Sequence, residues 1–204
     1  MELLLVRHAL PLRVEGANGA ADPELSTDGH AQAEHLATYL RGERIDALYA
    51  SPLRRAKQTA APVAAAFGLD VGIVDGVAEY DRHSDTYIPA EEMKASNHPM
   101  WQAIVNGEDI EGHEPRAEFH ARVLATVEQL VVDNPGRRIA VVCHGGVINS
   151  YLSHVLGLAV TTGFFYPNYT SINRVVAARS GERSISTVNE TSHLRGTGLR
   201  MGMH

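Results

Sequence analysis

Two histidines in this sequence follow directly on short apolar runs. His8, preceded by Arg7, comes after the run 3–6, and His144 comes after the run 139–143. Neutral imidazole can attack phosphorus and form a covalent intermediate. A guanidinium fork binds phosphate oxygens through paired hydrogen bonds and stays charged. The residue types at these two positions are therefore those of a phosphoryl-transfer site.

Three other residues supply what such a reaction still needs. Arg55 stands in a helical stretch after residue 51 and offers a second guanidinium. Glu79 can donate a proton to the leaving oxygen, provided that its carboxyl is held partly protonated. Gly145 opens the turn after His144, where backbone N–H groups at the start of a helix bind anions. No motif in the sequence resembles a nucleotide-binding loop or a nucleophilic serine elbow.

The elements that must position these residues alternate along the chain. Apolar runs predict strands, helical periodicity predicts the segments between them, and the two patterns occur in turn. This alternation predicts an α/β fold, a three-layer α/β/α sandwich with a mostly parallel central sheet. Ligands of such sheets bind beyond the carboxyl ends of the strands. Strands are expected at 3–6, 45–50, 71–74, 139–143, 173–178 and 184–189, and helices at 31–40, 51–67, 116–132 and 147–156.

The length of 204 residues suits one domain, expected over residues 1–194. Residues 76–115 mix Gly, Pro, His and acids with weak periodicity, so we expect a lid insertion that carries short helices. Residues 195–204 are rich in glycine and are expected to form a mobile tail.

Composition limits the classes of partner. The formal net charge is −6 and no basic run of five residues occurs, which disfavours nucleic acid as a partner. No apolar run reaches 18 residues, so no membrane partner is expected. The single cysteine, Cys143, rules out an internal disulfide and favours a cytoplasmic location. The histidines show no ligand spacing, so we expect neither metal nor cofactor. A homodimer is left open.

Five segments in order resemble the motifs of the histidine phosphatase superfamily, whose founding members are phosphoglycerate mutases. The acid Glu79 sits where that family has a Leu-x-Glu motif, and Asn168 and Ser171 resemble a late Asn-x-Ser feature. Because the resemblance spans about residues 1–194 and keeps the order of the motifs, it indicates membership. The segments are Leu4-Leu5-Val6-Arg7-His8-Ala9, Leu25 to Ala33, Ser51 to Ala60, the surroundings of Glu79, and Val141 to Gly146.

The resemblance assigns a role to each residue of the set. His8 would be the nucleophile that becomes phosphorylated, and Glu79 would protonate the leaving group and later activate water. Arg7, Arg55 and His144 would bind the phosphoryl oxygens, helped by the N–H of Gly145. The implied function is that of a metal-independent phosphomonoesterase for a small phosphorylated metabolite.

The sequence departs from the family pattern after the nucleophile. The family often has Gly after the first His, and Ala9 and Leu10 stand in this stretch instead. An Asn six positions after that His is replaced by Val14, and Arg13 is the nearest candidate to supply the missing phosphate contact. Further substrate contacts are expected from Arg82 and His83.

Other functions remain open from the sequence alone. The same site can return the phosphoryl group to a second hydroxyl, as in a phosphoglycerate mutase. A non-catalytic module that senses phosphate or binds a protein is a second alternative. A phosphoprotein phosphatase is a third, although the long segment 76–115 favours a covered pocket for small molecules.

Overall fold

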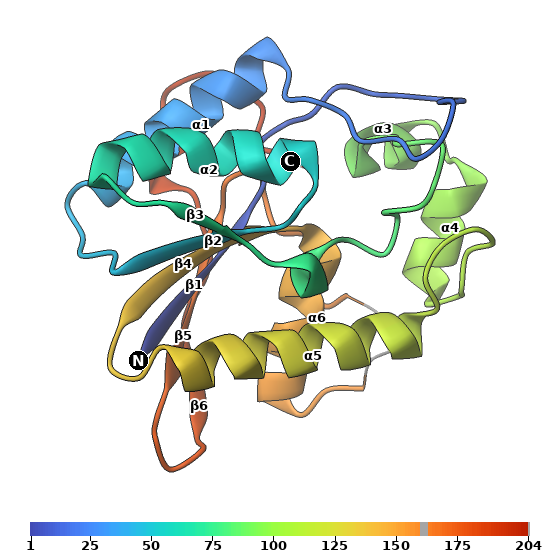
Figure 1. Cartoon of the computed structure of the whole chain (residues 1–204). Coiled ribbons are helices and arrows are strands. Elements are labelled where there is room, and N and C mark those ends of the chain that lie inside the picture. Colours follow the sequence, from blue (N-terminus) through green and yellow to red (C-terminus); the bar gives the residue numbers. More distant parts are fainter. Residues whose placement is uncertain (160–162, 204) are drawn as a thin grey trace.

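A computed structural model describes residues 1–159 and 163–203 of the chain (Figure 1). Its sheet has six strands in the order β3-β2-β4-β1-β5-β6. The first four are parallel to one another, whereas β5 and β6 run antiparallel to their neighbours. The predicted α/β class is confirmed. The strands are β1 (Glu2–Arg7), β2 (Ala47–Ala50), β3 (Val71–Ile73), β4 (Arg138–Cys143), β5 (Ile172–Ala177) and β6 (Arg183–Glu190).

The register of the two central strands sets up the site. β1 and β4 pair in parallel, and Arg7 lies opposite Cys143 at their carboxyl ends. The next residues along the chain are His8 and His144, so the two histidines leave the sheet side by side. Two segments separated by more than 130 positions thus meet at one edge.

Helices cover both faces of the sheet, as the three-layer prediction requires (Figure 1). Side chains alternate between the faces of β1. Leu4 and Val6 pack with helices α1 (Thr27–Leu40) and α2 (Arg54–Phe67). Leu3 and Leu5 pack with α5 (Arg116–Asp133) and α6 (Gly145–Leu156). Every one of these four β1 side chains is buried, which explains the continuous apolar run in the sequence.

A core substitution in β1 tests this packing. Leu5→Ala removes a side chain with no solvent exposure at the centre of the α5–α6 cluster. We expect it to lower the free energy of unfolding by about 2–5 kcal/mol, because the neighbours collapse only partly into the cavity. Urea denaturation measures this. Leu12→Ala, at a leucine that is 45% exposed, should change the free energy by no more than about 0.5 kcal/mol; equal effects would contradict the assignment of the core.

Two helix starts differ from the predicted ones. α1 begins at Thr27 because the Ser26 hydroxyl caps it, accepting from the Gly29 N–H at 3.0 Å. The helix predicted at 51–67 starts later, at Arg54, with Leu53 as its N-cap. Ser51 is instead fully buried beside the site.

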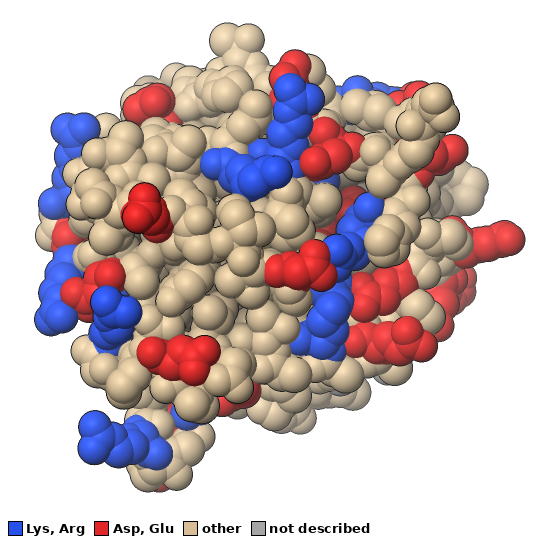
Figure 2. Space-filling model, in the orientation of Figure 1, with Lys and Arg blue, Asp and Glu red and all other residues tan. Residues whose placement is uncertain are grey.

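Residues 76–115 contain two short helices, α3 (Ala90–Ala95) and α4 (Pro99–Asn106), which project to one side of the sheet (Figure 1). A short turn of helix, η1 (Asp75–Val77), leads into this insertion. In Figure 2, acidic side chains gather on the side where α4 lies, and basic side chains are interspersed with acidic ones elsewhere on this face.

The segment 195–203, for which the sequence predicts a mobile tail, makes hydrogen bonds to the domain; His204 lies outside the described residues. After the short helix η2 (Ser192–Leu194), the chain returns to the carboxyl edge of the sheet. Gln32 donates from Nε2 to the Arg200 carbonyl, and the Tyr169 N–H donates to the Met201 carbonyl at 2.9 Å. Glycines in this segment therefore shape a path along the protein. None of the described helices is long and apolar enough to cross a membrane.

Candidate active site

His8 and His144 form the centre of the candidate site. Their ring centroids are 5.1 Å apart, and the exposed fractions of the two side chains are 3% and 0%. This closeness follows from the β1–β4 register described above. The site therefore holds two imidazoles within reach of a single phosphate-sized group.

One ring nitrogen of His8 is fixed by its own loop. Nδ1 lies 2.8 Å from the Ala9 carbonyl oxygen, which can only accept a hydrogen bond. Nδ1 consequently carries the proton in the neutral ring and Nε2 keeps its lone pair. The loop itself is held by the Ala9 N–H, which donates to Thr59 Oγ1 at 2.9 Å. This arrangement presents Nε2 as the nucleophilic atom.

Burial keeps the His8 ring neutral. It lowers the pKa of His8 well below the ordinary value, and the positive charges of Arg55 and Arg7 lower it further. The pKa of His144 is likewise well below its ordinary value, chiefly through burial and then through Arg55. A neutral imidazole is the form that can attack phosphorus, so the environment favours nucleophilic His8 over a wide pH range.

Arg7 is held by a backbone carbonyl from a distant segment and by an aromatic ring. Nη1 donates to the Pro167 carbonyl at 2.6 Å, and the guanidinium lies 4.1 Å from the centre of the Tyr169 ring. Its Nε is buried and has no hydrogen-bond partner among the described residues. An unpaired buried donor is costly unless a ligand satisfies it, which points to an anion at this place.

Arg55, on α2, likewise has buried guanidinium nitrogens that could bind an anion. Its side chain is 1% exposed, and Nη2 donates to Asp81 Oδ1 at 3.1 Å. The guanidinium lies 4.6 Å from the centre of the Tyr87 ring. Nε and Nη1 are buried and, within the part of the chain that is described, unpaired. Together with Arg7, Arg55 therefore provides three buried donors without acceptors.

His144 is oriented by Ser51. The Ser51 hydroxyl lies 2.7 Å from Nε2 of His144, and the same oxygen accepts from the Leu53 N–H at 3.3 Å. Nδ1 of His144 is buried and has no partner among the described residues. If the hydroxyl donates to Nε2, the ring proton sits on Nδ1, which is then a donor for a phosphoryl oxygen. The chain thus uses Ser51 to orient a ring rather than to cap α2.

Glu79 reaches the site from the start of the insertion. Its carboxylate accepts from the Gly146 N–H at 2.8 Å and from the Tyr80 N–H at 3.3 Å. Burial raises the pKa of Glu79 to about 7, and the nearby charge of Asp81 contributes to the rise. A carboxyl group that is half protonated near neutral pH can serve as an acid in one step and as a base in the next.

The contact between the Glu79 carboxylate and the Gly146 N–H requires a glycine at position 146. A Cβ at residue 146 would lie 2.3 Å from Glu79 Oε1. We expect Gly146→Ala to push the carboxyl aside and to lower kcat for an alkyl phosphate by about 10²-fold, because a displacement of 1 Å suffices for such a loss. Gly42→Ala is the matched control, since its Cβ would meet only a carbonyl at 3.8 Å. Full activity of Gly146→Ala in steady-state assays would argue against a role of the Glu79 position.

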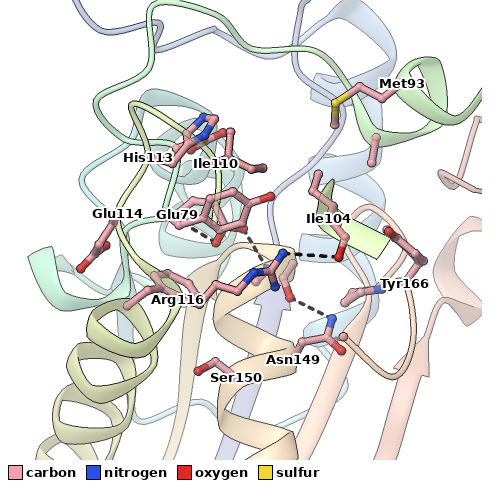
Figure 3. A pocket seen from close by; sticks show the side chains of 18 of the residues that line it. Glu79, Met93, Ile104, Ile110, His113, Glu114, Arg116, Asn149, Ser150 and Tyr166 are labelled. Atoms are coloured by element: carbon pink, nitrogen blue, oxygen red, sulfur yellow. Dashed lines mark hydrogen bonds between the residues drawn. The ribbon is translucent and has the colours of Figure 1, made fainter. Parts of the chain in front are cut away.

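A cavity of about 410 Å³ lies at this place, and residues of the insertion, Glu79 among them, form part of its wall (Figure 3); His144 is fully buried and is not one of the lining residues. Arg7, His8, Arg55 and Glu79 line it, and so does Gly145. Gly145 is the first residue of α6, with His144 as the preceding cap, so its N–H belongs to the positive end of a helix of 12 residues. The predicted catalytic set is therefore brought together, although its roles stay predictions.

The three predicted outer contacts lie elsewhere. Arg13 is half exposed, and its guanidinium pairs with the carboxylates of Glu15 and Glu92. Arg82 pairs with Asp75, and His83 is exposed. None of the three lines the cavity. Val14 forms a bridge with Tyr87 in this region, and Arg13 does not replace the family Asn as a phosphate contact.

Several cavity and supporting residues have no motif that could have revealed them. The ring of Tyr169 lies against Arg7 and that of Tyr87 against Arg55, and Asp81 accepts a hydrogen bond from Arg55. Arg116, the first residue of α5, also lines the cavity. Asn168 and Ser171, noted for their resemblance to a family feature, are buried with Asn168 Oδ1 and Ser171 Oγ unpaired in the described structure. Among the described residues, no three His, Cys, Asp or Glu side chains are grouped to hold a metal ion.

Comparison with known sequences decides the family. The sequence model of the histidine phosphatase superfamily (branch 1) matches residues 3–191. The chain belongs to this superfamily. The predicted family is thereby confirmed, and with it the class of enzyme, a phosphatase.

Some similar proteins carry phosphatase names, and others are named probable phosphoglycerate mutases. Phosphoserine phosphatase 1 of Hydrogenobacter thermophilus is 27% identical, over 95% of this chain and 94% of its own. Among solved structures, a mycobacterial glucosyl-3-phosphoglycerate phosphatase is 22% identical with a TM-score of 0.75, covering 93% and 99% of the two chains. The phosphoserine phosphatase of Entamoeba histolytica, solved with 3-phosphoglyceric acid, is 24% identical with a TM-score of 0.71, covering 95% and 98%. These structures share the fold.

Proposed function

We propose that this protein hydrolyses a small phosphorylated metabolite through a phosphohistidine on His8. One observation carries the proposal: a nucleophilic ring nitrogen, buried arginine donors without acceptors and a carboxyl with a pKa of about 7 converge at one cavity. Phosphomonoester hydrolysis is also the reaction that the phosphatase names of the relatives describe. The roles below are those that the geometry supports.

The two arginines and the N-terminus of α6 bind the phosphoryl group of the substrate. The phosphoryl oxygens accept from Nε of Arg7 and from Nε and Nη1 of Arg55. His144 Nδ1 and the Gly145 N–H supply further donors at the start of α6. Because these groups are already in place and buried, they stabilise the charge of the transition state without reorganisation.

The first chemical step transfers the phosphoryl group to the protein. His8 Nε2 forms a bond to phosphorus while the bond from phosphorus to the ester oxygen breaks. The leaving oxygen takes a proton from the Glu79 carboxyl group, so the product is a neutral alcohol. His8 Nδ1 remains hydrogen-bonded to Ala9, which stabilises the charge that the ring acquires.

The second step returns the site to its starting state. Water attacks phosphorus opposite His8 Nε2 and gives a proton to the Glu79 carboxylate. The bond from Nε2 to phosphorus breaks, and inorganic phosphate leaves. Glu79 ends the cycle protonated and His8 neutral, so each turnover consumes one water and no cofactor. The pKa of about 7 suits both tasks of Glu79.

A small substrate is supported by the covered cavity. Its volume of about 410 Å³ lies within the range typical of small-molecule sites. The relatives point the same way, since their names refer to phosphoserine and to glucosyl-3-phosphoglycerate. A protein surface would require a site with a shorter insertion than residues 76–115.

A phosphatase assay tests the proposal. The purified protein should release phosphate from 4-nitrophenyl phosphate and from members of a panel of phosphorylated metabolites, with equal rates before and after treatment with a chelator. The same samples should convert little 3-phosphoglycerate to 2-phosphoglycerate. Loss of activity on chelation would overturn the metal-free mechanism, and rapid interconversion of the phosphoglycerates would favour the mutase alternative.

The cellular location, the binding partners and the oligomeric state of the protein stay predictions. We propose a cytoplasmic enzyme that needs no nucleic acid, in line with its net charge of −6 and its single cysteine. Whether it is a homodimer is decided by light scattering coupled to size-exclusion chromatography.

A further inference from the structure

Arg116 lines the cavity that holds His8 but has no part in the mechanism above. It is the first residue of α5, and Figure 3 shows its guanidinium extending into the space between Glu79 and Ile104. Nε donates to the Glu108 carbonyl at 2.9 Å, and Nη2 lies 3.3 Å from the Ile104 carbonyl. Neutral backbone oxygens therefore hold the side chain in one position.

The guanidinium of Arg116 forms no ion pair among the described residues. No carboxylate lies within 4.0 Å of its guanidinium in the described residues, although five acids line the same cavity: Glu79, Asp81, Glu108, Asp109 and Glu114. Glu108 contributes only its carbonyl, and Asp109 accepts the backbone N–H of Arg116 at 2.9 Å. Glu114 is bound to Arg122. Of the other two acids, Glu79 accepts from backbone N–H groups and Asp81 pairs with Arg55, so none of the five forms an ion pair with Arg116.

One nitrogen of Arg116 remains available to a ligand. Nη1 donates none of the hydrogen bonds found among the described residues, and it is not one of the buried unpaired atoms, so it is accessible from the cavity. The cavity wall around it is largely apolar and weakens solvent screening, which strengthens the attraction between this cation and an anion. That wall includes Tyr80, Ile104, Ile110, Phe119 and Tyr166.

We propose that Arg116 binds a second anionic group, carried by the alcohol part of the substrate. The inference rests on the proposed phosphatase function, in which the phosphate itself occupies Arg7, Arg55 and His144. Arg7 and Arg116 are the cavity arginines without a carboxylate partner in the described structure. The site would thus recognise both ends of its substrate, a phosphate ester at one end and a carboxylate or second phosphate at the other.

The test compares substrates that differ in that one group. Glycerol phosphate is 3-phosphoglycerate with a hydroxymethyl group in place of the carboxylate. The wild-type protein should prefer 3-phosphoglycerate by about 10- to 100-fold in kcat/KM, the range expected for a hydrogen bond between charged groups. Propanediol bisphosphate and propanediol monophosphate form the second pair, which shows whether a phosphate takes the same place.

Variants locate the preference. Arg116→Gln should bring the kcat/KM ratio of the preferred pair close to one, and Arg116→Lys should keep part of it. Arg82→Gln is the matched control, because Arg82 lies in the insertion that precedes Arg116 but pairs with Asp75 outside the cavity. Equal kcat/KM values for both pairs in the wild type, or a ratio that survives in Arg116→Gln, would overturn the inference. Failure of the wild type to hydrolyse even 4-nitrophenyl phosphate would instead overturn the proposed function.

Discussion

His8→Ala is expected to lower kcat for 4-nitrophenyl phosphate by at least about 10³-fold. Removal of a nucleophile that forms a covalent intermediate typically costs this much or more, because the remaining groups bind substrate without a route to product. The alanine lacks Nε2, the lone pair that the Ala9 contact leaves free. Steady-state kinetics measures the loss, and circular dichroism checks that the variant is folded.

The effect must be specific to this histidine. His30→Ala is the control, since His30 is exposed on α1, and it should retain wild-type kcat. Binding of inorganic phosphate to His8→Ala should persist, since the arginine donors remain. A His8→Ala protein that turns over at the wild-type rate would remove the basis of the proposed mechanism.

Glu79→Gln is expected to lower kcat for an alkyl phosphate by about 10²- to 10⁴-fold, the usual contribution of a positioned proton donor. The amide cannot donate a proton to the leaving oxygen and cannot take one from water. With 4-nitrophenyl phosphate the loss in the first step should be smaller, because nitrophenolate leaves without a proton. The ratio of the two losses, measured by single-turnover kinetics, separates proton donation from general damage.

The same carboxyl sets the pH dependence. Glu79 donates only when protonated, and its pKa is raised to about 7, so kcat/KM should fall as the pH rises through about 7. His8 attacks only when neutral, and its pKa is well below 6.5, so the decline on the acidic side lies well below that value. Activity should be highest between the two apparent pKa values.

A matched variant identifies the group responsible for the alkaline decline. Glu79→Gln should abolish the decline near pH 7, whereas Glu111→Gln, at an exposed acid of the same insertion, should leave the profile unchanged. A wild-type profile that is flat from acidic to alkaline pH would contradict the paired roles of His8 and Glu79.

The strands and the central residues could be predicted because their signals are local. The apolar runs of β1 and β4 are buried on both faces, and such runs have few other interpretations. The positions of His8 and His144 then follow from the rule that ligands bind at the carboxyl ends of parallel strands. The antiparallel edge formed by β5 and β6 adds to the mostly parallel sheet without changing this geometry.

Contacts between distant segments could not be predicted. Serine is a residue type that often caps helices, but the Ser51 hydroxyl instead forms a hydrogen bond with the buried His144, 93 positions away. Arg13 and Arg82 have the charge that a phosphate needs, but nearby acids neutralise both. Arg116 shows the converse, since only the structure reveals that its charge lacks a carboxylate partner among the described residues.

The tail illustrates a limit of composition. Its glycines favour mobility, but backbone hydrogen bonds to Gln32 and Tyr169 fix segments that composition alone would leave free. Residue type sets what a segment can do, and tertiary contacts decide which of these possibilities is realised.

Rapid quenching in alkali, followed by peptide mapping, tests the central claim most directly. During turnover of a phosphate ester, the peptide that contains His8 should gain one phosphoryl group, which disappears when the substrate is exhausted. Glu79→Gln should accumulate more of this species with 4-nitrophenyl phosphate, since water lacks its base in the second step. Continued turnover with no label on His8, or with the label on His144, would contradict the account.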